Sequence, residues 1–120
     1  MKNSSKPKNS FINYYAIVDF IGPFYTKKAL DVINWQFDKN FIYGWGIDWD
    51  CCYQIRKNGL KVAIDYNSQI KHYGSTTYKN KRDKEFSNEH EYHQKASKVF
   101  HEVMEKKYGI NWRERIINLI

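Results

Sequence analysis

Two carboxylates and two tryptophans alternate in the segment 43–50, which reads Tyr-Gly-Trp-Gly-Ile-Asp-Trp-Asp. Two glycines separated by one residue indicate a tight turn or a close approach of the backbone. Indole rings suit flat or ring-shaped ligands, and a carboxylate beside them can bind a hydroxyl or accept its proton. Asp48 and Asp50 are therefore candidate site residues, while a single acid at a helix start also favours the helix dipole without any further role.

The histidines offer a second set of candidate ligands. His72 is expected at the end of an extended segment, where functional side chains are common, although a lone histidine is more often structural. His90 and His93 lie one helical turn apart, and His101 follows two turns later. This H-x-x-H spacing differs from the H-E-x-x-H zinc signature, so a solvated amphipathic helix is the favoured interpretation. These residues leave one further functional alternative, a zinc hydrolase that uses His72, Asp48 and the helix histidines, although their spacing does not favour it.

Basic residues outnumber acidic ones, 20 to 13, and give a formal net charge of +7. Such a balance attracts phosphates, nucleic acid or an anionic membrane surface. Several of these charges lie in the segment 71–84, where Tyr73 and Tyr78 are interleaved and Phe86 follows. The segment could contact a phosphate or a nucleic acid. No RNA-binding, helix-turn-helix, zinc or phosphate-loop motif accompanies it, so there is no strong nucleic-acid signal.

The segments that must position these residues alternate between extended and helical patterns. Gly59 and Gly109 favour helix ends, while Thr26, Asn88 and Asn111 favour helix starts. The predicted strands cover 11–21, 60–66 and 69–73, and the predicted helices cover 27–32, 48–58, 89–108 and 112–119. The apolar stripe predicted on the long helix consists of Ala96, Val99, Phe100, Val103 and Met104. The predicted fold class is α+β, derived from an α/β arrangement, with a short mixed sheet, flanking helices and C-terminal helices.

A chain of 120 residues accommodates one domain. We predict a flexible lead-in over 1–10, a basic loop over 79–87 and a C-terminal helical segment over 88–120. The only cysteines, Cys51 and Cys52, are neighbours, and a bridge between them would close a strained ring. The absence of a disulfide framework, of an apolar run fit for a signal peptide and of an 18-residue apolar span predicts a cytoplasmic location, or peripheral contact with a membrane.

The segment 44–59 (GWGIDWDCCYQIRKNG), followed by 62–65 (VAID) and 70–74 (IKHYG), resembles the C-terminal half of GT-A-type glycosyltransferases, above all family 2. Those enzymes have Gly-Glu-Asp-x-Asp-x-Cys-x-Arg-x-x-x-x-Gly on a short helix, then a strand and His-x-Gly. The Gly-Trp-Gly-x-Asp form is also similar to a loop of β-1,4-galactosyltransferases. Ile47 and Gln54 depart from the family pattern, which usually has Glu and Arg there. The region 11–78 is thus predicted to be a partial GT-A-like, acceptor-side region.

The resemblance implies a role for each residue that matches the family motif. Asp48 would be the general base that deprotonates the acceptor hydroxyl. The other implied site residues are Trp45, Gly46, Trp49 and Asp50 for the acceptor, His72 for a divalent cation (Mn or Mg), and Lys71 and Tyr73 for the donor diphosphate.

The implied activity is transfer of a sugar from a nucleotide-sugar donor to a glycan or another hydroxyl acceptor. No Asp-x-Asp metal motif precedes residue 15, so the resemblance implies only the acceptor-side half of an enzyme. The nucleotide-binding half would belong to a partner chain or to a longer parent protein, and activity of the chain alone stays open. The alternative is a non-catalytic basic module that binds an anionic glycan or nucleic acid through the segment 71–84.

Overall fold

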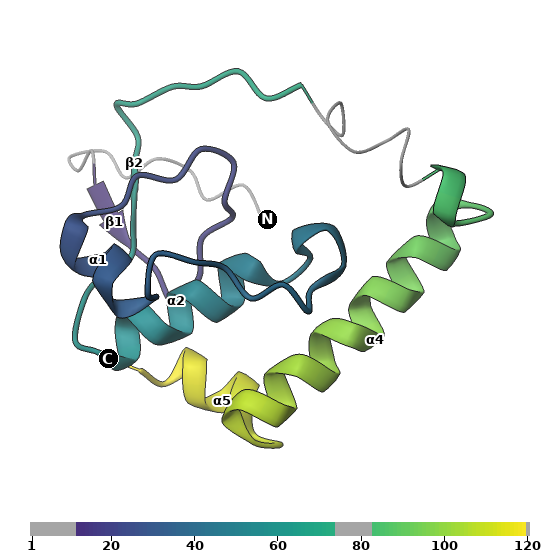
Figure 1. The fold of residues 1–120 in the computed structure, drawn as a ribbon. Helices are drawn as coiled ribbons and strands as arrows, with labels where there is room; N and C mark the ends of the chain where they lie inside the picture. The colour runs from purple at the N-terminus through teal and green to yellow at the C-terminus, as the bar shows by residue number, and fades with distance from the viewer. Residues whose placement is uncertain (1–11, 74–82, 120) are drawn as a thin grey trace.

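The computed structural model describes residues 12–73 and 83–119, which form a mixed arrangement of helices and one small sheet (Figure 1). The elements in chain order are β1 (Ile12–Tyr14), α1 (Lys27–Val32), η1 (Ile42–Gly44), α2 (Ile47–Lys57), β2 (Ala63–Asp65), α4 (Glu89–Tyr108) and α5 (Trp112–Ile117). Residues 83–85 add a single helical turn before α4. The predicted α+β class is confirmed.

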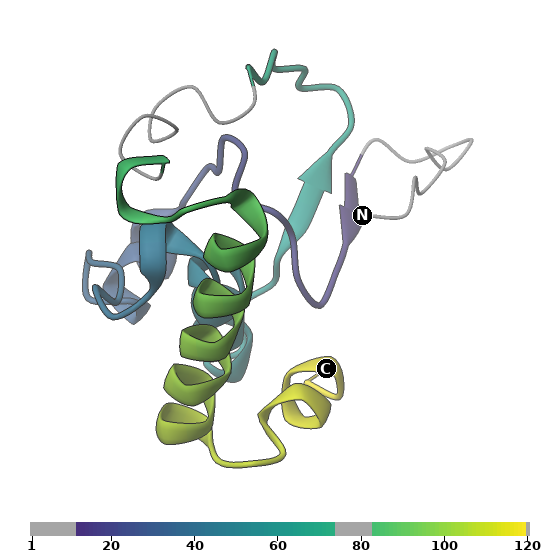
Figure 2. The ribbon, with the colours of Figure 1, turned by 90° about the vertical axis from the view of Figure 1, so that its right-hand side faces the viewer.

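The sheet is smaller than predicted. β1 and β2 pair antiparallel, with Ile12 opposite Asp65 and Tyr14 opposite Ala63, and they lie at the edge of the molecule (Figure 2). Within the described residues the sheet has two strands and is not mixed. The predicted strand over 69–73 is wrong, because these residues form no strand and join neither β1 nor β2. A strand is stabilised by its cross-strand partner rather than by its own sequence alone, and here only one pair forms.

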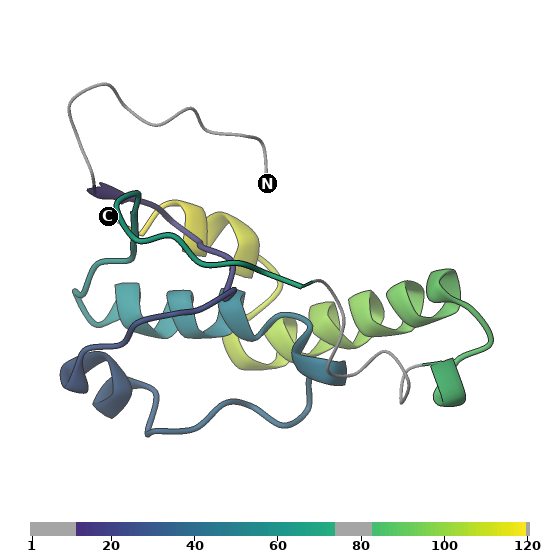
Figure 3. The ribbon, with the colours of Figure 1, turned by 90° about the horizontal axis from the view of Figure 1, so that it is seen from above.

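The segment between β1 and α1 was predicted to continue the first strand to residue 21. Instead, residues 15–26 run irregularly along α2 before they reach α1 (Figure 3). Phe20 and Tyr25 pack there against the core that α1 and α2 share, which contains the buried residues Ala29, Ile33, Cys51 and Ile55. This route carries the chain from the sheet across the start of α2, next to the glycine-rich loop.

The helices around that loop begin and end where local signals predict. Thr26 Oγ1 accepts a hydrogen bond from the Ala29 amide at 3.1 Å and starts α1. α2 has two acids in its first turn and two basic residues in its last, as the helix dipole favours. Asn58 closes α2, and Gly59 follows with φ of +78°. Both helices therefore confirm the sequence prediction to within one residue at each end.

The long helix α4 has the predicted bounds. Asn88 Oδ1 accepts a hydrogen bond from the Glu91 amide at 2.8 Å, and Gly109 ends the helix with φ of +89°. Its buried residues are Tyr92, Ala96, Phe100 and Met104, which recur every four positions. Val99 and Val103, which were predicted in the stripe, are half-buried. Tyr92 was missed because its hydroxyl makes tyrosine a weaker marker of burial.

The last helix is shorter than predicted. α5 ends at Ile117, and Asn111 occupies the predicted N-cap position but makes no side-chain capping hydrogen bond. α5 turns back from the end of α4 toward α2 (Figure 1), and Arg56 on α2 hydrogen-bonds the Ile116 carbonyl of α5. Trp112 and Ile116 are buried. The C-terminal helices are thereby part of the same packed body as α2.

The predicted basic loop over 79–87 is described only from residue 83 onward. There Phe86 is 9% exposed and packs with Tyr92 and Ala96. Phe86 is therefore a core residue, and its predicted availability for a phosphate or nucleic-acid contact is wrong. The lead-in predicted over 1–10 lies outside the described residues. Among the helices of the described part of the chain, none combines the length and the apolar character needed to cross a membrane.

Candidate functional site

A pocket of about 780 Å³ lies where the glycine-rich loop meets α4, α5 and the irregular segment before α1. Its walls are largely aromatic. Two carboxylates, Asp19 and Asp48, reach it from the N-terminal part of the chain. Three side chains that can donate hydrogen bonds, Ser97, His101 and Arg113, reach it from the C-terminal helices. A pocket of this size and lining is suited to a small hydroxylated or ring-shaped ligand.

The loop that forms one wall depends on backbone conformations that favour glycine. Gly44 and Gly46 have φ of +80° and +107°, and Tyr43 before them also has a positive φ of 46°. Gly46 lies directly before α2 and against the Phe100 ring, since an added Cβ would come within 2.9 Å of Phe100 Cε2. The close backbone approach that the glycine spacing predicts is confirmed, and it brings α4 against the start of α2.

Asp48 stands in the first turn of α2 and is half-buried at the pocket wall. Its Oδ1 accepts a hydrogen bond from the Trp49 amide at 2.9 Å. Burial raises the pKa of the Asp48 carboxyl. The hydrogen bond from the Trp49 amide lowers this pKa, whereas the charge of Asp19 and a hydrogen bond with the Asp19 side chain raise it, and the net pKa lies above its ordinary value. The Asp48 carboxyl therefore holds a proton more readily than an exposed carboxyl would.

The two tryptophans of the loop occupy different positions. Trp45 is 37% exposed and packs at a tilted angle against His93, with ring centroids 5.0 Å apart. Trp49 is half-buried, and its ring meets that of Trp112 edge to face at 5.7 Å. Both line the pocket. Trp45 is thus an accessible wall of the pocket, whereas Trp49 also stabilises the core beneath it.

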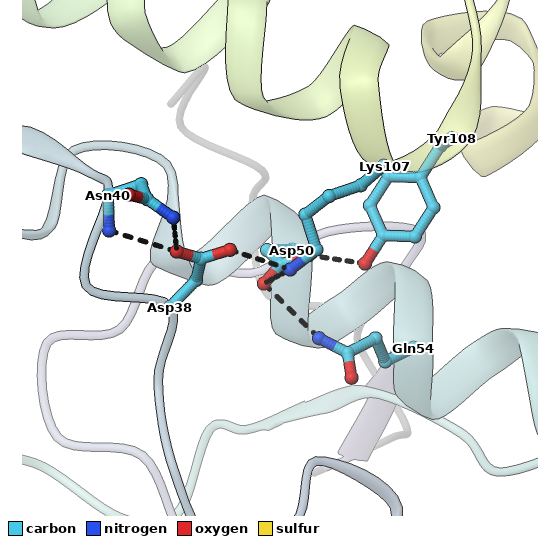
Figure 4. A network of polar contacts seen from close by, with 6 residues as sticks. All are labelled: Asp38, Asn40, Asp50, Gln54, Lys107 and Tyr108. Carbon is cyan, nitrogen blue, oxygen red and sulfur yellow. Dashed lines mark hydrogen bonds and ion pairs between the residues drawn. The ribbon is translucent and has the colours of Figure 1, made fainter.

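Asp50 does not line the pocket, in contrast to its predicted place in an acceptor site. Its side chain is 2% exposed and lies in a polar network (Figure 4). Lys107 Nζ lies 2.7 Å from its Oδ2, Gln54 Nε2 donates to the same oxygen at 3.2 Å, and the Tyr108 hydroxyl donates to Oδ1. We therefore assign Asp50 a structural role, because its contacts with Lys107 and Tyr108 join α2 to the end of α4.

The network continues from Lys107 to the loop before η1. Lys107 Nζ also contacts Asp38 Oδ2 at 3.1 Å, and Asp38 Oδ1 accepts hydrogen bonds from Asn40 (Figure 4). Burial alone would lower the pKa of the Lys107 ammonium, but the hydrogen bonds and charges of Asp50 and Asp38 outweigh it and raise that pKa. Burial and the Asp50 carboxylate raise the pKa of the Tyr108 hydroxyl. The lysine thereby stays charged between two carboxylates.

The residues predicted to bind the donor and its metal lie elsewhere. Lys71, His72 and Tyr73 are all exposed, and Lys71 Nζ lies over the Tyr73 ring at 4.7 Å from its centroid. His72 lines neither the pocket of Asp48 nor the second pocket beside Cys52. Residues 12–73 and 83–119 contain no group of three His, Cys, Asp or Glu side chains able to hold a metal ion. Among these described residues, His72 therefore belongs to no such group, and the predicted cation site stays a prediction.

Three pocket residues, Asp19, Ser97 and Arg113, were not singled out from the sequence as site residues, and His101 was considered only as a zinc ligand. Asp19 lies inside the predicted first strand, as a lone acid among apolar residues. Ser97 and His101 are four apart on α4 and therefore share a face. Arg113 follows the buried Trp112 on α5. Only the folded chain brings these side chains to one pocket.

No protein-family model, curated protein sequence or solved structure matches this chain significantly. The fold and the pocket define an α+β protein with an aromatic-walled site that holds paired carboxylates.

The raised pKa of Asp48 predicts that Asp48→Asn stabilises the protein at neutral pH. Because the folded-state pKa lies above the unfolded one, the charged carboxylate opposes folding as pH rises through and above the ordinary value near 3.8. We expect the free energy of unfolding to increase by up to about 1 kcal/mol at pH 7, and the gain to vanish at low pH. Urea unfolding of both proteins across this pH range measures it.

Asp31→Asn is the matched control, since its exposed carboxylate accepts hydrogen bonds from Trp35 Nε1 and Lys27 Nζ. These partners lower the pKa of Asp31, so this substitution is expected to reduce stability slightly at neutral pH. Equal effects of the two substitutions would contradict a special environment at Asp48.

Proposed function

We propose that this chain provides the acceptor side of a glycosyl transfer reaction, with Asp48 as the general base. The observation that carries the proposal is the half-buried Asp48 carboxyl, which lines an aromatic-walled pocket beside the second carboxylate of Asp19. The loop sequence, which resembles the acceptor loop of GT-A-type glycosyltransferases, supports the same assignment. We also propose that the α+β fold is part of a GT-A-like domain.

The chemistry follows from the weak nucleophilicity of a sugar hydroxyl at neutral pH. Asp48 takes the hydroxyl proton while the oxygen attacks the anomeric carbon of a nucleotide-sugar, and the nucleoside diphosphate leaves. Because Asp48 Oδ1 already accepts a hydrogen bond from the Trp49 amide, we assign Oδ2 as the oxygen that takes the hydroxyl proton. The raised pKa makes Asp48 a stronger base than an exposed carboxylate, and Asp19 stabilises its protonated form.

The aromatic walls serve binding in this proposal. Apolar faces of a sugar ring pack on indole rings, and Trp45 and Trp49 both line the pocket. The nucleotide-sugar is held by a partner chain or by another part of a longer protein. No step of this proposal is assigned to a metal.

Asp48→Asn is expected to lower transfer at least about 100-fold, the usual contribution of a general base. The measurement is incorporation of labelled sugar from a mixture of nucleotide-sugars in extracts of cells that express the protein, with Asp31→Asn as the control. Near-normal transfer by Asp48→Asn would remove the base assignment. If extracts that contain the unsubstituted protein transfer no more sugar than extracts without it, the proposed activity is wrong.

The alternative of a basic binding module is supported by the net charge of +7 and by the exposed Lys71 and Tyr73. It predicts that affinity for a polyanion such as heparin falls steeply with salt and survives Asp48→Asn. The buried Phe86 removes one of the aromatic contacts on which this alternative relied.

A further inference from the structure

The pocket is chemically two-sided. Its carboxylates, Asp19 and Asp48, come from the segment before α1 and from the start of α2. Its hydrogen-bond donors, Ser97, His101 and Arg113, come from α4 and α5. Carboxylates favour ligand groups that donate protons, whereas a guanidinium favours a carboxylate or a phosphate. One ligand that satisfies both sides must carry both kinds of group.

Arg113 is placed to bind an anion. Its guanidinium carbon lies 5.3 Å from the ring centroid of Trp112 and 5.8 Å from that of Trp49. Stacking on two indoles restrains the guanidinium, so less conformational freedom is lost when it binds. Within the described residues no carboxylate pairs with Arg113, since the ion pairs there involve other basic side chains. The guanidinium thus reaches the pocket with its donors available.

The neighbouring side chains extend this donor group. Ser97 and His101 line the same pocket and lie one helical turn apart on α4. The His101 ring packs against that of Trp112 at 5.7 Å, next to the residue that carries the guanidinium. A hydroxyl, an imidazole and a guanidinium together match the several oxygens of a carboxylate or phosphate.

We infer that the pocket recognises an anionic hydroxylated ligand, such as a uronic acid or a sugar phosphate, through its carboxylate or phosphate at Arg113. Hydroxyls of the same ligand face Asp48 and Asp19. The inference rests on the proposed function, because it names the class of acceptor that this pocket takes. It also explains how a ligand can bind beside two carboxylates, since its anionic group is held by a separate set of side chains.

The test is a fluorescence titration of the purified chain with three probes: glucuronate, glucose 6-phosphate and glucose. Trp45 and Trp49 line the pocket and report binding. We expect at least one anionic probe to bind about tenfold or more tightly than glucose, as a charge-assisted contact provides. Glucuronate and glucose 6-phosphate distinguish a carboxylate from a phosphate as the preferred group. Binding of neither anionic probe, or equal binding of glucose, overturns the inference.

Variants on one helix locate the anion. Arg113→Gln is expected to remove about tenfold of the anionic affinity. Arg115→Gln makes the same change of charge outside the pocket, where Arg115 Nη1 donates to the Tyr108 carbonyl, and is expected to bind the probe normally. Equal losses in the two variants would show general attraction by charge and overturn the site.

A third variant keeps the test valid if Arg113→Gln does not fold, which is a concern because Arg113 also contacts two tryptophans. Arg113→Lys keeps the charge but loses the planar fork, so we expect affinity between those of the unsubstituted protein and Arg113→Gln. Thermal unfolding of each variant identifies a folded sample. Unchanged affinity in a folded Arg113→Gln variant overturns the inference. If Arg113→Gln does not fold, the inference is overturned by an Arg113→Lys variant that keeps the full affinity and the full preference for the anionic probe.

The inference and the proposed function can fail separately. Binding of an anionic probe that depends on Arg113, in a protein whose Asp48→Asn variant transfers sugar normally, supports the inference and removes the proposed base. Transfer to a neutral acceptor that is lost in Asp48→Asn but unchanged in Arg113→Gln overturns the inference and leaves the proposed function standing.

Discussion

Lys107→Met is expected to lower the free energy of unfolding by about 3–5 kcal/mol, because it leaves the Asp50 carboxylate buried without its charged partner. Asp50 is 2% exposed, and Lys107 Nζ lies 2.7 Å from its Oδ2. The Tyr108 hydroxyl and the Gln54 amide still donate to Asp50 in the variant, but neither supplies a positive charge. Equilibrium unfolding in urea, followed by circular dichroism, measures the change.

Lys98→Met is the matched control on the same helix. Lys98 pairs with Glu102 at 3.9 Å on the exposed face of α4, and such pairs contribute roughly 0.5 kcal/mol or less. A Lys107→Met variant that loses no more than Lys98→Met would contradict the assignment of Lys107 as the partner of a buried charge.

The pH dependence of stability gives a second measure of the same network. The folded-state pKa of Lys107 is raised, so its contribution is full below the ordinary value of 10.5 and is lost as pH rises through the folded-state pKa. The pKa of Asp38 is lowered, because hydrogen bonds from Asn40 and the ammonium of Lys107 outweigh the effect of burial. Its contribution is full above the ordinary value of 3.8 and is lost as pH falls below it. Stability should therefore be highest near neutral pH, and its alkaline decline should be smaller in Lys107→Met.

Gly46→Ala is expected to destabilise the protein by roughly 2–4 kcal/mol, the sum of two effects. Alanine disfavours the φ of +107° that Gly46 adopts, and its methyl group would overlap the Phe100 ring. Phe100 is itself buried, at 6% exposure, and packs with Phe41, Met104 and Trp112, so it has little room to move. Thermal or urea unfolding of the variant measures the loss.

Gly59→Ala separates these two effects. Gly59 has a φ of +78°, but an added methyl group there meets nothing within 4 Å, so we expect only the backbone cost of about 1 kcal/mol. The double variant Gly46→Ala/Phe100→Leu provides room for the methyl and should be less destabilised than the sum of its single variants. Additive losses would show that the clash with Phe100 is not the cause.

The helices could be predicted from the sequence because their ends are set by neighbouring residues. Thr26 and Asn88 bond amides three residues ahead, and Gly59 and Gly109 follow the helices that they end. Strands lack such local determinants. The segment 69–73 has a suitable composition, but its fate depends on whether a partner strand lies beside it, and composition does not encode that partner.

The site could be predicted only in its contiguous part. The glycines and Asp48 lie within a few residues of one another, so their spacing already indicates a turn before a helix. Asp50 was expected beside them, but its burial depends on Lys107, which is 57 positions away. Arg113 joins the pocket only because α5 folds back toward α2 (Figure 1). Such partners are fixed by tertiary packing rather than by local spacing.

The contact between Gly46 and Phe100 also bears on the order of events during synthesis. Asp48 and its glycine loop leave the ribosome well before α4 does, yet Phe100, Ser97 and Arg113 supply the rest of the pocket. A chain that is still growing therefore carries the proposed base without the walls that bury it. In this proposal its ability to bind a ligand arises only when α4 and α5 have been synthesised and have docked on α2.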